Sequence, residues 1–436
     1  MKRTPYLQLL KWKESTGRKP LILNGARQIG KTWLLKEFGQ NEFEHLAYIS
    51  CDSEPLAETL FTDYDVKRII RTVETIAQVP VVAGKTLIVF DEIQELPRGL
   101  GALKYFCENA PEYHVAVAGS LLGIALHQGT SFPVGKVDML DIFPMTFMEF
   151  LWAVGEEALA NVLEAKDWPV VETLHPKYVE LLRQYYYVGG MPEAVLAYST
   201  GKSLKSIRGI QQRILKAYQA DISKHAPKRD VQRVNMVLNS IPSQLAKENK
   251  KFIYGAIKKG ARAAEFELAI QWLVDTGIVH KVHRVTKPGN PLKFYEDPNA
   301  FKLFLLDCGL FGAMSGADAA HVLLGDNCFT EYKGAFTEQF VMQHLATVDG
   351  LPVFYYSSDT QLEIDFLIQY DGVVAPVEVK AEENLRSKSL KVFSERFDLK
   401  KKFRISMRHF EERDGLTDIP LYAVPVYFKS EEDEIE

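Results

Sequence analysis

The sequence predicts an α/β fold organised around a parallel sheet. Short apolar stretches at residues 21–24, 45–50 and 86–90 alternate with stretches whose apolar residues recur at helical spacing. Strands that alternate with helices pair in parallel, because each helix returns the chain to the edge from which the next strand starts. Ligands of such sheets bind outside the carboxyl ends of the strands. The residues that follow each apolar stretch are therefore the first candidates for function.

Composition indicates a globular protein of several domains. The chain has 436 residues, which is more than one hydrophobic core usually supports. A hydrophobic content of 47% with 25% charged residues excludes wholesale disorder. The net charge of −5 gives no global basic field for nucleic acid, although a local basic groove stays open. The four cysteines form no Cys-x-x-Cys pair, so we expect reduced thiols rather than disulfides or a zinc site.

Nothing in the sequence predicts a membrane partner. Residues 1–20 are basic but lack the apolar segment of a signal peptide. The most apolar stretch, residues 115–126, is too short to cross a bilayer. We therefore expect a soluble, cytoplasmic protein.

The first expected strand leads into a Gly-x-x-x-x-Gly-Lys-Thr pattern, which is typical of a phosphate-binding P-loop. Its glycines let backbone N–H groups approach the phosphates, and the helix that follows directs its positive dipole end at them. Lys31 is expected to reach the β- and γ-phosphates of ATP, and the Thr32 hydroxyl to complete a Mg²⁺ site. The predicted nucleotide-binding residues are Gly25, Ala26, Arg27, Gln28, Ile29, Gly30, Lys31 and Thr32.

The third apolar stretch ends in two acids, Asp91 and Glu92, which is the Walker B pattern. Asp91 is expected to hold Mg²⁺, through water or through Thr32. Glu92 is expected to orient or deprotonate the attacking water. A further apolar strand at residues 113–118 ends before Ser120, which is our candidate for a sensor that bonds this water; an ordinary serine at a strand end is the alternative. A fifth strand is expected at residues 137–143.

These motifs resemble those of prokaryotic AAA-type ATPases, which are related to the archaeal ATPases of the origin-recognition branch. The resemblance rests on GARQIGKT (25–32), DEIQ (91–94), Gly119-Ser120, FPMTFMEFL (143–151) and GG-x-P-E (189–193), and it covers nearly the whole chain. It implies that the sensor strand lies between the P-loop strand and the Walker B strand. Ser50 stands where many members carry asparagine, which leaves a switch contact with Glu92 open. The sequence assigns no arginine finger; Lys136 is one of several candidates.

The middle of the chain is expected to be helical and then to form a winged helix. Residues 156–232 have helical patterning, and by position they correspond to the lid of an AAA module. Within residues 233–325, two helices precede a strand at 278–285, and a Pro-Gly-Asn-Pro turn returns the chain into residues 292–296. Such a fold usually places its second helix in DNA. Two glutamates near the start of that helix favour a protein-contact role instead. The basic residues of the wing leave DNA binding as the alternative.

A second candidate site lies in the last hundred residues, on a hairpin with Asp371-Gly372 as its two-residue turn. Counting back from this turn places Asp365 directly opposite Glu378. Two facing carboxylates repel. A divalent cation between them, Mg²⁺ or Mn²⁺, would remove the repulsion and supply Lewis acidity. Lys380 would then stabilise charge at a scissile phosphate.

The spacing Asp365-x(12)-Glu378-x-Lys380 resembles the PD-(D/E)XK fold of restriction endonucleases and Holliday-junction resolvases. The resemblance implies that Asp365, Glu378 and Lys380 are catalytic, that Glu338 on the preceding helix is an extra metal ligand beside Asp365 and Glu378, and that a helix follows at residues 387–393. A solvent-facing hairpin with ordinary alternating charges is the alternative. The acidic tail, residues 430–436, is expected to be disordered.

The sequence thus predicts an AAA/ASCE P-loop core (1–155), a helical lid (156–232), a winged-helix-like domain (233–325) and a nuclease-like domain (326–436). The predicted function is an ATP-hydrolysing switch coupled to a nuclease-like domain that acts on DNA or RNA. The alternative is an ATP-dependent regulatory protein whose nuclease-like domain only binds a partner. A protein partner and a homo-oligomer both stay open.

Overall fold

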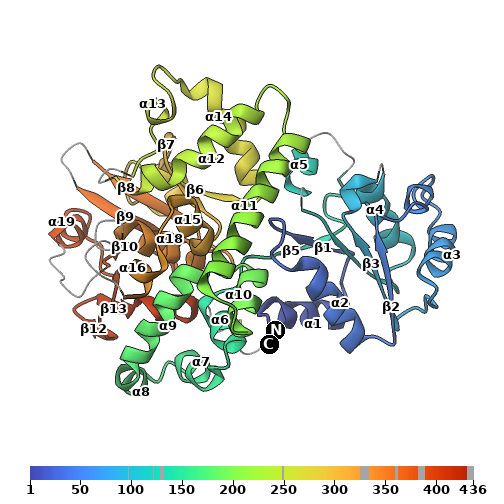
Figure 1. Ribbon diagram of the computed structural model, residues 1–436, viewed down its shortest axis with the longest axis horizontal. Coiled ribbons are helices and arrows are strands. Elements are labelled where there is room, and N and C mark those ends of the chain that lie inside the picture. Colours follow the sequence, from blue (N-terminus) through green and yellow to red (C-terminus); the bar gives the residue numbers. More distant parts are fainter. Residues whose placement is uncertain are drawn as a thin grey trace. The chain divides into compact units, whose positions relative to one another are not determined.

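The computed structural model describes residues 1–96, 98–120, 122–127, 132–247, 250–324, 333–358, 362–381 and 388–429 (Figure 1). The acidic tail and Cys328 lie outside these residues. The chain divides into two compact units. The first comprises Met1–Phe143 and Asp275–Gly277, and the second comprises Pro144–Val274 and Ile278–Glu436. No helix in the described part of the chain is both long enough and apolar enough to cross a membrane.

The first unit contains a five-stranded parallel sheet with the order β2-β3-β4-β1-β5 (Figure 1). This confirms the predicted α/β class, and β4 lies between β1 and β3 as the resemblance implies. β3 and β4 are buried along their whole length, which explains their uninterrupted apolar sequences. The strands are β1 Leu21–Asn24, β2 His45–Ser50, β3 Thr86–Asp91, β4 His114–Ala118 and β5 Asp138–Asp141.

Helices cover this sheet. α3 begins where the Asp65 side chain accepts a hydrogen bond from the Lys67 N–H, and a separate 3-10 turn at Ala57–Thr59 precedes it. Leu103 on α4 and Ile69 on α3 pack in one core with Phe90 of the sheet. The helical elements are α1 Pro5–Glu14, α2 Lys31–Glu42, η1 Ala57–Thr59, α3 Val66–Ala77, η2 Ile93–Glu95, α4 Gly99–Asn109 and α5 Leu122–His127.

The second unit begins with a run of helices, in agreement with the helical patterning of residues 156–232. α6 opens with a capping box, in which Thr146 and Glu149 each accept the other's backbone N–H. The helices are α6 Phe147–Ala153, α7 Glu157–Glu164, α8 Trp168–Thr173, α9 His175–Val188, α10 Pro192–Ser199, α11 Leu204–His225, α12 Val231–Leu245, α13 Tyr254–Ile257 and α14 Ala263–Asp275.

The GG-x-P-E element is a structural junction of the second unit. The Gly190 N–H donates to the buried Asp307 carboxylate at 2.5 Å, and the Gly190 carbonyl accepts from the Met145 N–H at 2.7 Å. Asp307 also accepts from the Leu310 N–H and thereby caps α15, Cys308–Ser315. Burial raises the pKa of Asp307 to about 6. The element therefore ties the start of α6 to the start of α15.

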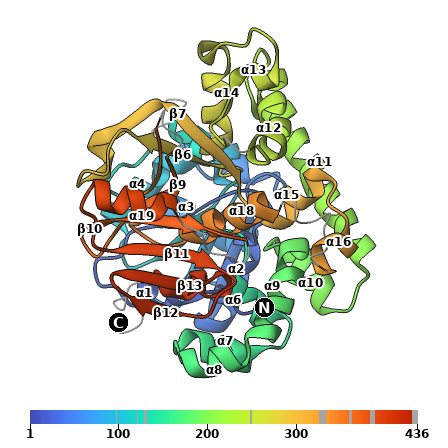
Figure 2. The same ribbon diagram turned by 90° about the vertical axis from the view of Figure 1, so that its left-hand side faces the viewer.

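An eight-stranded mixed sheet completes the second unit, with the order β12-β13-β11-β10-β9-β8-β6-β7. Figure 2 shows β10, β11, β13 and β12 as neighbours at one end of this sheet. The strands are β6 Val279–Val285, β7 Glu296–Leu305, β8 Val353–Ser357, β9 Glu363–Tyr370, β10 Val373–Val379, β11 Lys402–Ser406, β12 Glu411–Arg413 and β13 Leu416–Pro420. The remaining helical elements are η3 Leu292–Tyr295, α16 Ala319–Leu324, α18 Lys333–Leu345, α19 Lys388–Arg396, η4 Leu421–Ala423 and α20 Val424–Tyr427.

The hairpin expected as a wing belongs to this sheet. β6 and β7 pair in antiparallel fashion, and β6 also pairs with β8. The returning strand begins at Glu296, whereas we expected it at residue 292. Leu292 is instead fully buried in a 3-10 turn, and its N–H donates to Gln369 Oε1 at 3.0 Å. Residues expected in a winged helix and in a nuclease-like domain thus share one sheet.

Helix α18 is a buried helix whose polar side chains satisfy backbone groups of its neighbours. Gln339 bonds both the N–H and the carbonyl of Leu305. His344 accepts the Phe147 N–H through Nε2 at 3.0 Å, and its Nδ1 lies 2.8 Å from the Phe340 carbonyl. Burial lowers the pKa of His344 to about 4, so the ring is neutral with its proton on Nδ1. Glu338 lies on this same helix.

Candidate functional site

The P-loop lies between the end of β1 at Asn24 and the start of α2 at Lys31. Gly25 and Gly30 have positive φ angles of 137° and 94°. A Cβ at Gly25 would overlap the Ile142 carbonyl, so the loop also needs glycine there for space. The predicted strand, loop and helix are therefore present, with backbone N–H groups at the start of α2 available for phosphate.

The side chain of Lys31 packs against the backbone of the P-loop. Its Nζ donates to the carbonyls of Gly25 and Ala26, both at 2.7 Å, and the residue is 6% exposed. Burial lowers the pKa of Lys31 to about 8, while Glu92 and Asp91 oppose this shift. The ammonium group thus lies within the phosphate-binding loop, held by acceptors that phosphate oxygens can replace.

The structure brings together the two motifs that were predicted to form a magnesium site. Thr32 Oγ1 donates to Asp91 Oδ2 at 2.7 Å. Tyr48 on β2 donates its hydroxyl to the same oxygen at 2.8 Å. Burial and then Asp91 raise the pKa of Tyr48, so the phenol stays a donor. A hydroxyl and a carboxylate in contact are oxygen ligands of the kind that Mg²⁺ takes, so these residues fit the predicted ion.

Glu92 and Ser120 also come together. Glu92 Oε2 accepts from the Ser120 N–H and the Ser120 hydroxyl, each at 3.1 Å, and from the Gln94 amide at 2.5 Å. Glu92 Oε1 is bonded only by a long contact to the Ser120 hydroxyl, at 3.3 Å, among the contacts of the described residues. Ser50, whose role the resemblance left open, donates its hydroxyl to Asp52. The carboxylate is therefore anchored from the side of Ser120.

The C-terminal hairpin has the register that its turn predicts. Tyr370 pairs with Val373, and the ladder continues to Phe366 opposite Val377. Asp365 is the next residue, and its Oδ2 accepts the Val379 N–H at 2.8 Å. Its carboxylate is therefore held beside the strand that carries Glu378, as the pattern requires.

The acids and lysines of this region form what we name the charged cluster. Lys380 Nζ lies 2.7 Å from Glu378 Oε1, and Lys302 Nζ lies 2.8 Å from Glu363 Oε1. Lys250 is ion-paired with Glu338, and Lys302 lies 3.9 Å from the same carboxylate. The members are Lys250, Lys302, Glu338, Glu363, Asp365, Glu378 and Lys380. All four residues predicted for the nuclease-like site thus lie in the cluster, which also contains two lysines and a glutamate that the prediction did not include.

Burial governs the electrostatics of the cluster. Lys302 is fully buried and Glu338 is 3% exposed. Burial raises the pKa of Glu338, and Asp365 raises it further. Burial opposes the charge on Lys380, but Glu378 and Asp365 hold its pKa above the ordinary value. Among the described residues, no three His, Cys, Asp or Glu side chains are grouped so that they could hold a metal ion.

Comparison with known families identifies the domain that contains the P-loop. Residues 17–151 match the family described as an AAA domain. The first unit is an AAA-type P-loop ATPase domain. Residues 179–321 match a domain of unknown function (DUF8612), and residues 333–427 match a second domain of unknown function (DUF4143). The family of the C-terminal segment therefore assigns no activity to the charged cluster.

Solved structures show distant similarity. The Walker-type ATPase PABY2304 of Pyrococcus abyssi is 14% identical over 71% of this chain and 94% of its own, with a TM-score of 0.45. The ORC2 protein of Aeropyrum pernix, as ADPNP–ADP complexes, is 13% identical over 76% and 91%, with a TM-score of 0.36. The ORC1 protein of the same organism, in complex with DNA, is 14% identical over 72% and 89%, with a TM-score of 0.27. None of the curated proteins compared with the chain matches it.

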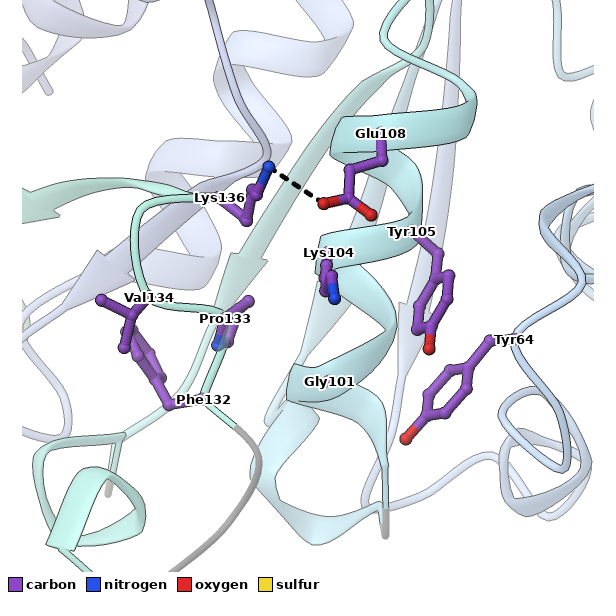
Figure 3. Close-up of a pocket in the computed structure, with 9 residues that line it drawn as sticks. All are labelled: Tyr64, Gly101, Lys104, Tyr105, Glu108, Phe132, Pro133, Val134 and Lys136. Carbon is purple, nitrogen blue, oxygen red and sulfur yellow. Dashed lines mark ion pairs between the residues drawn. The ribbon is translucent and has the colours of Figure 1, made fainter.

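A separate hollow of about 430 Å³ lies in the AAA domain (Figure 3). The rings of Tyr64 and Tyr105 stack at 4.4 Å on one side, and Lys136 is ion-paired with Glu108 at 2.9 Å on the other. None of its lining residues belongs to the P-loop or to Asp91 and Glu92. Lys136, a candidate for the arginine-finger position, thus lies at the hollow in an ion pair.

The sequence patterns assigned no role to three residues that shape the nucleotide site of the AAA domain, although Gln94 ends the DEIQ motif (91–94). Arg3 is 4% exposed, and its guanidinium donates to the carbonyls of Ile29 and Phe143 at 2.9 and 2.8 Å. It therefore braces the P-loop from outside. Tyr48 and Gln94, which bond Asp91 and Glu92, are the other two. Only Gln94 had a local signal, because it lies two residues beyond Glu92 on the same short turn.

Proposed function

We propose that the chain is an ATP-hydrolysing molecular switch whose second unit delivers the output. The observation that carries the proposal is the convergence of Lys31, Thr32, Asp91 and Glu92 in one AAA domain. Lys31 binds and neutralises phosphate oxygens, and Thr32 and Asp91 would hold Mg²⁺, which would supply further charge neutralisation at the phosphates. Glu92, anchored through Oε2, presents Oε1 to the attacking water and takes its proton. Ser120 holds Glu92 in this orientation.

ATP binding is expected to weaken as the pH rises above about 8, because burial lowers the pKa of Lys31 to about 8. Below that pH the ammonium already carries its charge, so binding requires no proton. Above it, binding must first protonate Lys31, so the apparent Kd is expected to rise by up to about tenfold per pH unit. A titration with a fluorescent ATP analogue between pH 7 and 9.5 measures this.

Two variants isolate the role of Lys31. Lys31→Arg keeps a charge over the whole range, so its affinity, although weaker, should not depend on pH. Lys31→Ala should not bind ATP measurably. A wild-type Kd that stays constant from pH 7 to 9.5 would contradict the lowered pKa of Lys31, and unchanged binding in Lys31→Ala would remove Lys31 from the phosphate contacts.

The proposed output is metal-dependent action on a nucleic-acid phosphodiester at the charged cluster. The register of the hairpin and the contact between Lys380 and Glu378 support this assignment. Asp365 and Glu378 would hold Mg²⁺ or Mn²⁺, which supplies Lewis acidity at the phosphate. Lys380 would stabilise negative charge on the phosphate oxygens, whereas Glu338 is ion-paired with Lys250 in this structure.

Cleavage should be tested with duplex, single-stranded and branched DNA and with RNA, with Mg²⁺ or Mn²⁺ and with or without ATP. We expect Asp365→Ala to lose cleavage by at least about 100-fold while it retains ATP hydrolysis, because the carboxylate lies outside the AAA domain. Asp371→Asn, at the exposed turn of the same hairpin, is the matched control and should cleave like the wild type, because asparagine removes the charge but tolerates the positive φ of 50° at this position.

The second candidate function is an ATP-dependent interaction protein whose nuclease-like fold binds a partner without cleaving it. The pairing of Lys302 with Glu363 and of Lys250 with Glu338 favours this function, because lysines already neutralise carboxylates of the cluster. The absence of cleavage across the whole substrate panel would decide for it.

A further inference from the structure

The charged cluster contains cations that come from outside the nuclease-like segment. Lys302 lies on β7, and Lys250 lies in the connection between α12 and α13. Lys250 is paired with Glu338, which also lies within 4 Å of Lys302. Two ammonium groups are therefore directed at the carboxylate that was predicted as an extra metal ligand.

The two lysines differ in how easily their ammonium groups can move away from the carboxylates of the cluster. Lys302 is fully buried in the middle of β7, where its partner in the ladder is Val282. Moving its ammonium group away from Glu363 would leave a buried charge without its partner. The side chain of Lys250 is 16% exposed and belongs to no helix or strand. Its backbone becomes anchored two residues later, where the Phe252 N–H donates to the Phe301 carbonyl at 2.8 Å. Lys250 can therefore turn toward solvent while the sheet stays intact.

We propose that Lys250 is a built-in cation that competes with a divalent metal ion for the charged cluster. Its pairing with Glu338 keeps the cluster closed to metal, and its release opens the site. This regulation rests on the proposed metal-dependent function of the second unit. It adds a gate that the sequence motif Asp365-x(12)-Glu378-x-Lys380 does not contain.

The charges of the cluster support the gate. With Lys250 in place, four carboxylates stand against three ammonium groups, which leaves a formal charge of −1. Without Lys250 the formal charge becomes −2, which matches a divalent cation. Glu338 is 3% exposed, so its interactions are poorly screened by water, and after Lys250 leaves only Lys302, at 3.9 Å, offsets its charge. A metal ion can take the place of the lost cation.

The test measures binding of Mn²⁺ alone to the full-length chain without nucleotide, from the loss of the free Mn²⁺ signal in electron paramagnetic resonance. We expect Lys250→Met to bind one Mn²⁺ ion at the charged cluster, with an affinity at least about tenfold higher than that of the wild-type cluster. Lys250→Arg, which keeps the cation, should behave like the wild type. Lys247→Met, at an exposed lysine nearby, is the matched control. Adding Asp365→Asn to Lys250→Met should remove the gain, which assigns it to the cluster rather than to the AAA domain.

Thermal melts establish that each variant is folded, and Lys250→Gln, which keeps a hydrogen-bond donor for Glu338, replaces Lys250→Met if the latter is not. Equal Mn²⁺ affinity in the wild type and in the folded neutral variants overturns the gate. The cleavage panel separates this result from the proposed function. Tighter Mn²⁺ binding without cleavage retains the gate and removes the nuclease. Cleavage that depends on Asp365 and is equally fast with and without Lys250 retains the nuclease and removes the gate.

Discussion

Replacing Glu92 with glutamine should lower the turnover of ATP by about 100-fold or more while ATP binding stays close to that of the wild type. Glutamine has the shape of glutamate, and its side-chain oxygen can still accept the hydrogen bonds that Ser120 and Gln94 give to Oε2. It cannot take a proton from water. Phosphate release at saturating ATP measures turnover, and a fluorescent nucleotide measures binding.

Glu95→Gln is the matched control for this variant. Glu95 lies three residues further along the same turn and is exposed, so its loss removes the same charge without touching the site. It should hydrolyse ATP like the wild type. Unchanged hydrolysis in Glu92→Gln would show that another group activates the water, and equal losses in both variants would point to the charge of the turn.

The nucleotide site was predictable because its motifs are local. The P-loop residues are contiguous, and Asp91 and Glu92 are neighbours at the end of one apolar strand, so both patterns are visible without knowledge of the fold. Arg3 and Tyr48 are different. Arg3 bonds the P-loop carbonyl of Ile29 from 26 residues away, and Tyr48 reaches Asp91 from the adjacent strand over 43 residues. The order of the strands brings Tyr48 to the site, and the packing of the N-terminal segment brings Arg3 there.

In the charged cluster, too, local contacts were predictable from the sequence and contacts between distant residues were not. The two-residue turn at Asp371-Gly372 determines the hairpin register, so the approach of Asp365 to the strand of Glu378 was predictable. Lys250 precedes its partner Glu338 by 88 residues, and no local pattern connects them. The role of Lys302 could not be predicted from the sequence for another reason. A lysine within residues 300–305 interrupts the apolar pattern of β7, and only its pairing with the buried Glu338 and the partly exposed Glu363 explains why it is in the core.

The GG-x-P-E element is expected to be essential for the stability of the second unit. Gly190→Ala should lower the free energy of unfolding by about 3 kcal/mol or more, which is the cost of overpacking against a part that does not yield. A Cβ at this position would overlap the backbone carbonyl of Met145 and also approach its nitrogen and carbonyl carbon. Relief would require a shift of the Gly190 N–H away from the buried Asp307, which would lose a charged hydrogen bond. Urea unfolding followed by circular dichroism measures the loss.

The same substitution at Gly209 is expected to raise the free energy of unfolding rather than lower it. Gly209 lies within α11 with no atom near its missing Cβ, so alanine should stabilise the helix by about 0.5–1 kcal/mol. Equal effects of the two changes would contradict the junction that we assign to Gly190. Because Gly190 belongs to the second unit, Gly190→Ala should still bind ATP at a temperature where that unit is folded. Loss of ATP binding under those conditions would mean that the element also serves the nucleotide, and the observed bonds to Met145 and Asp307 would then be only part of its role.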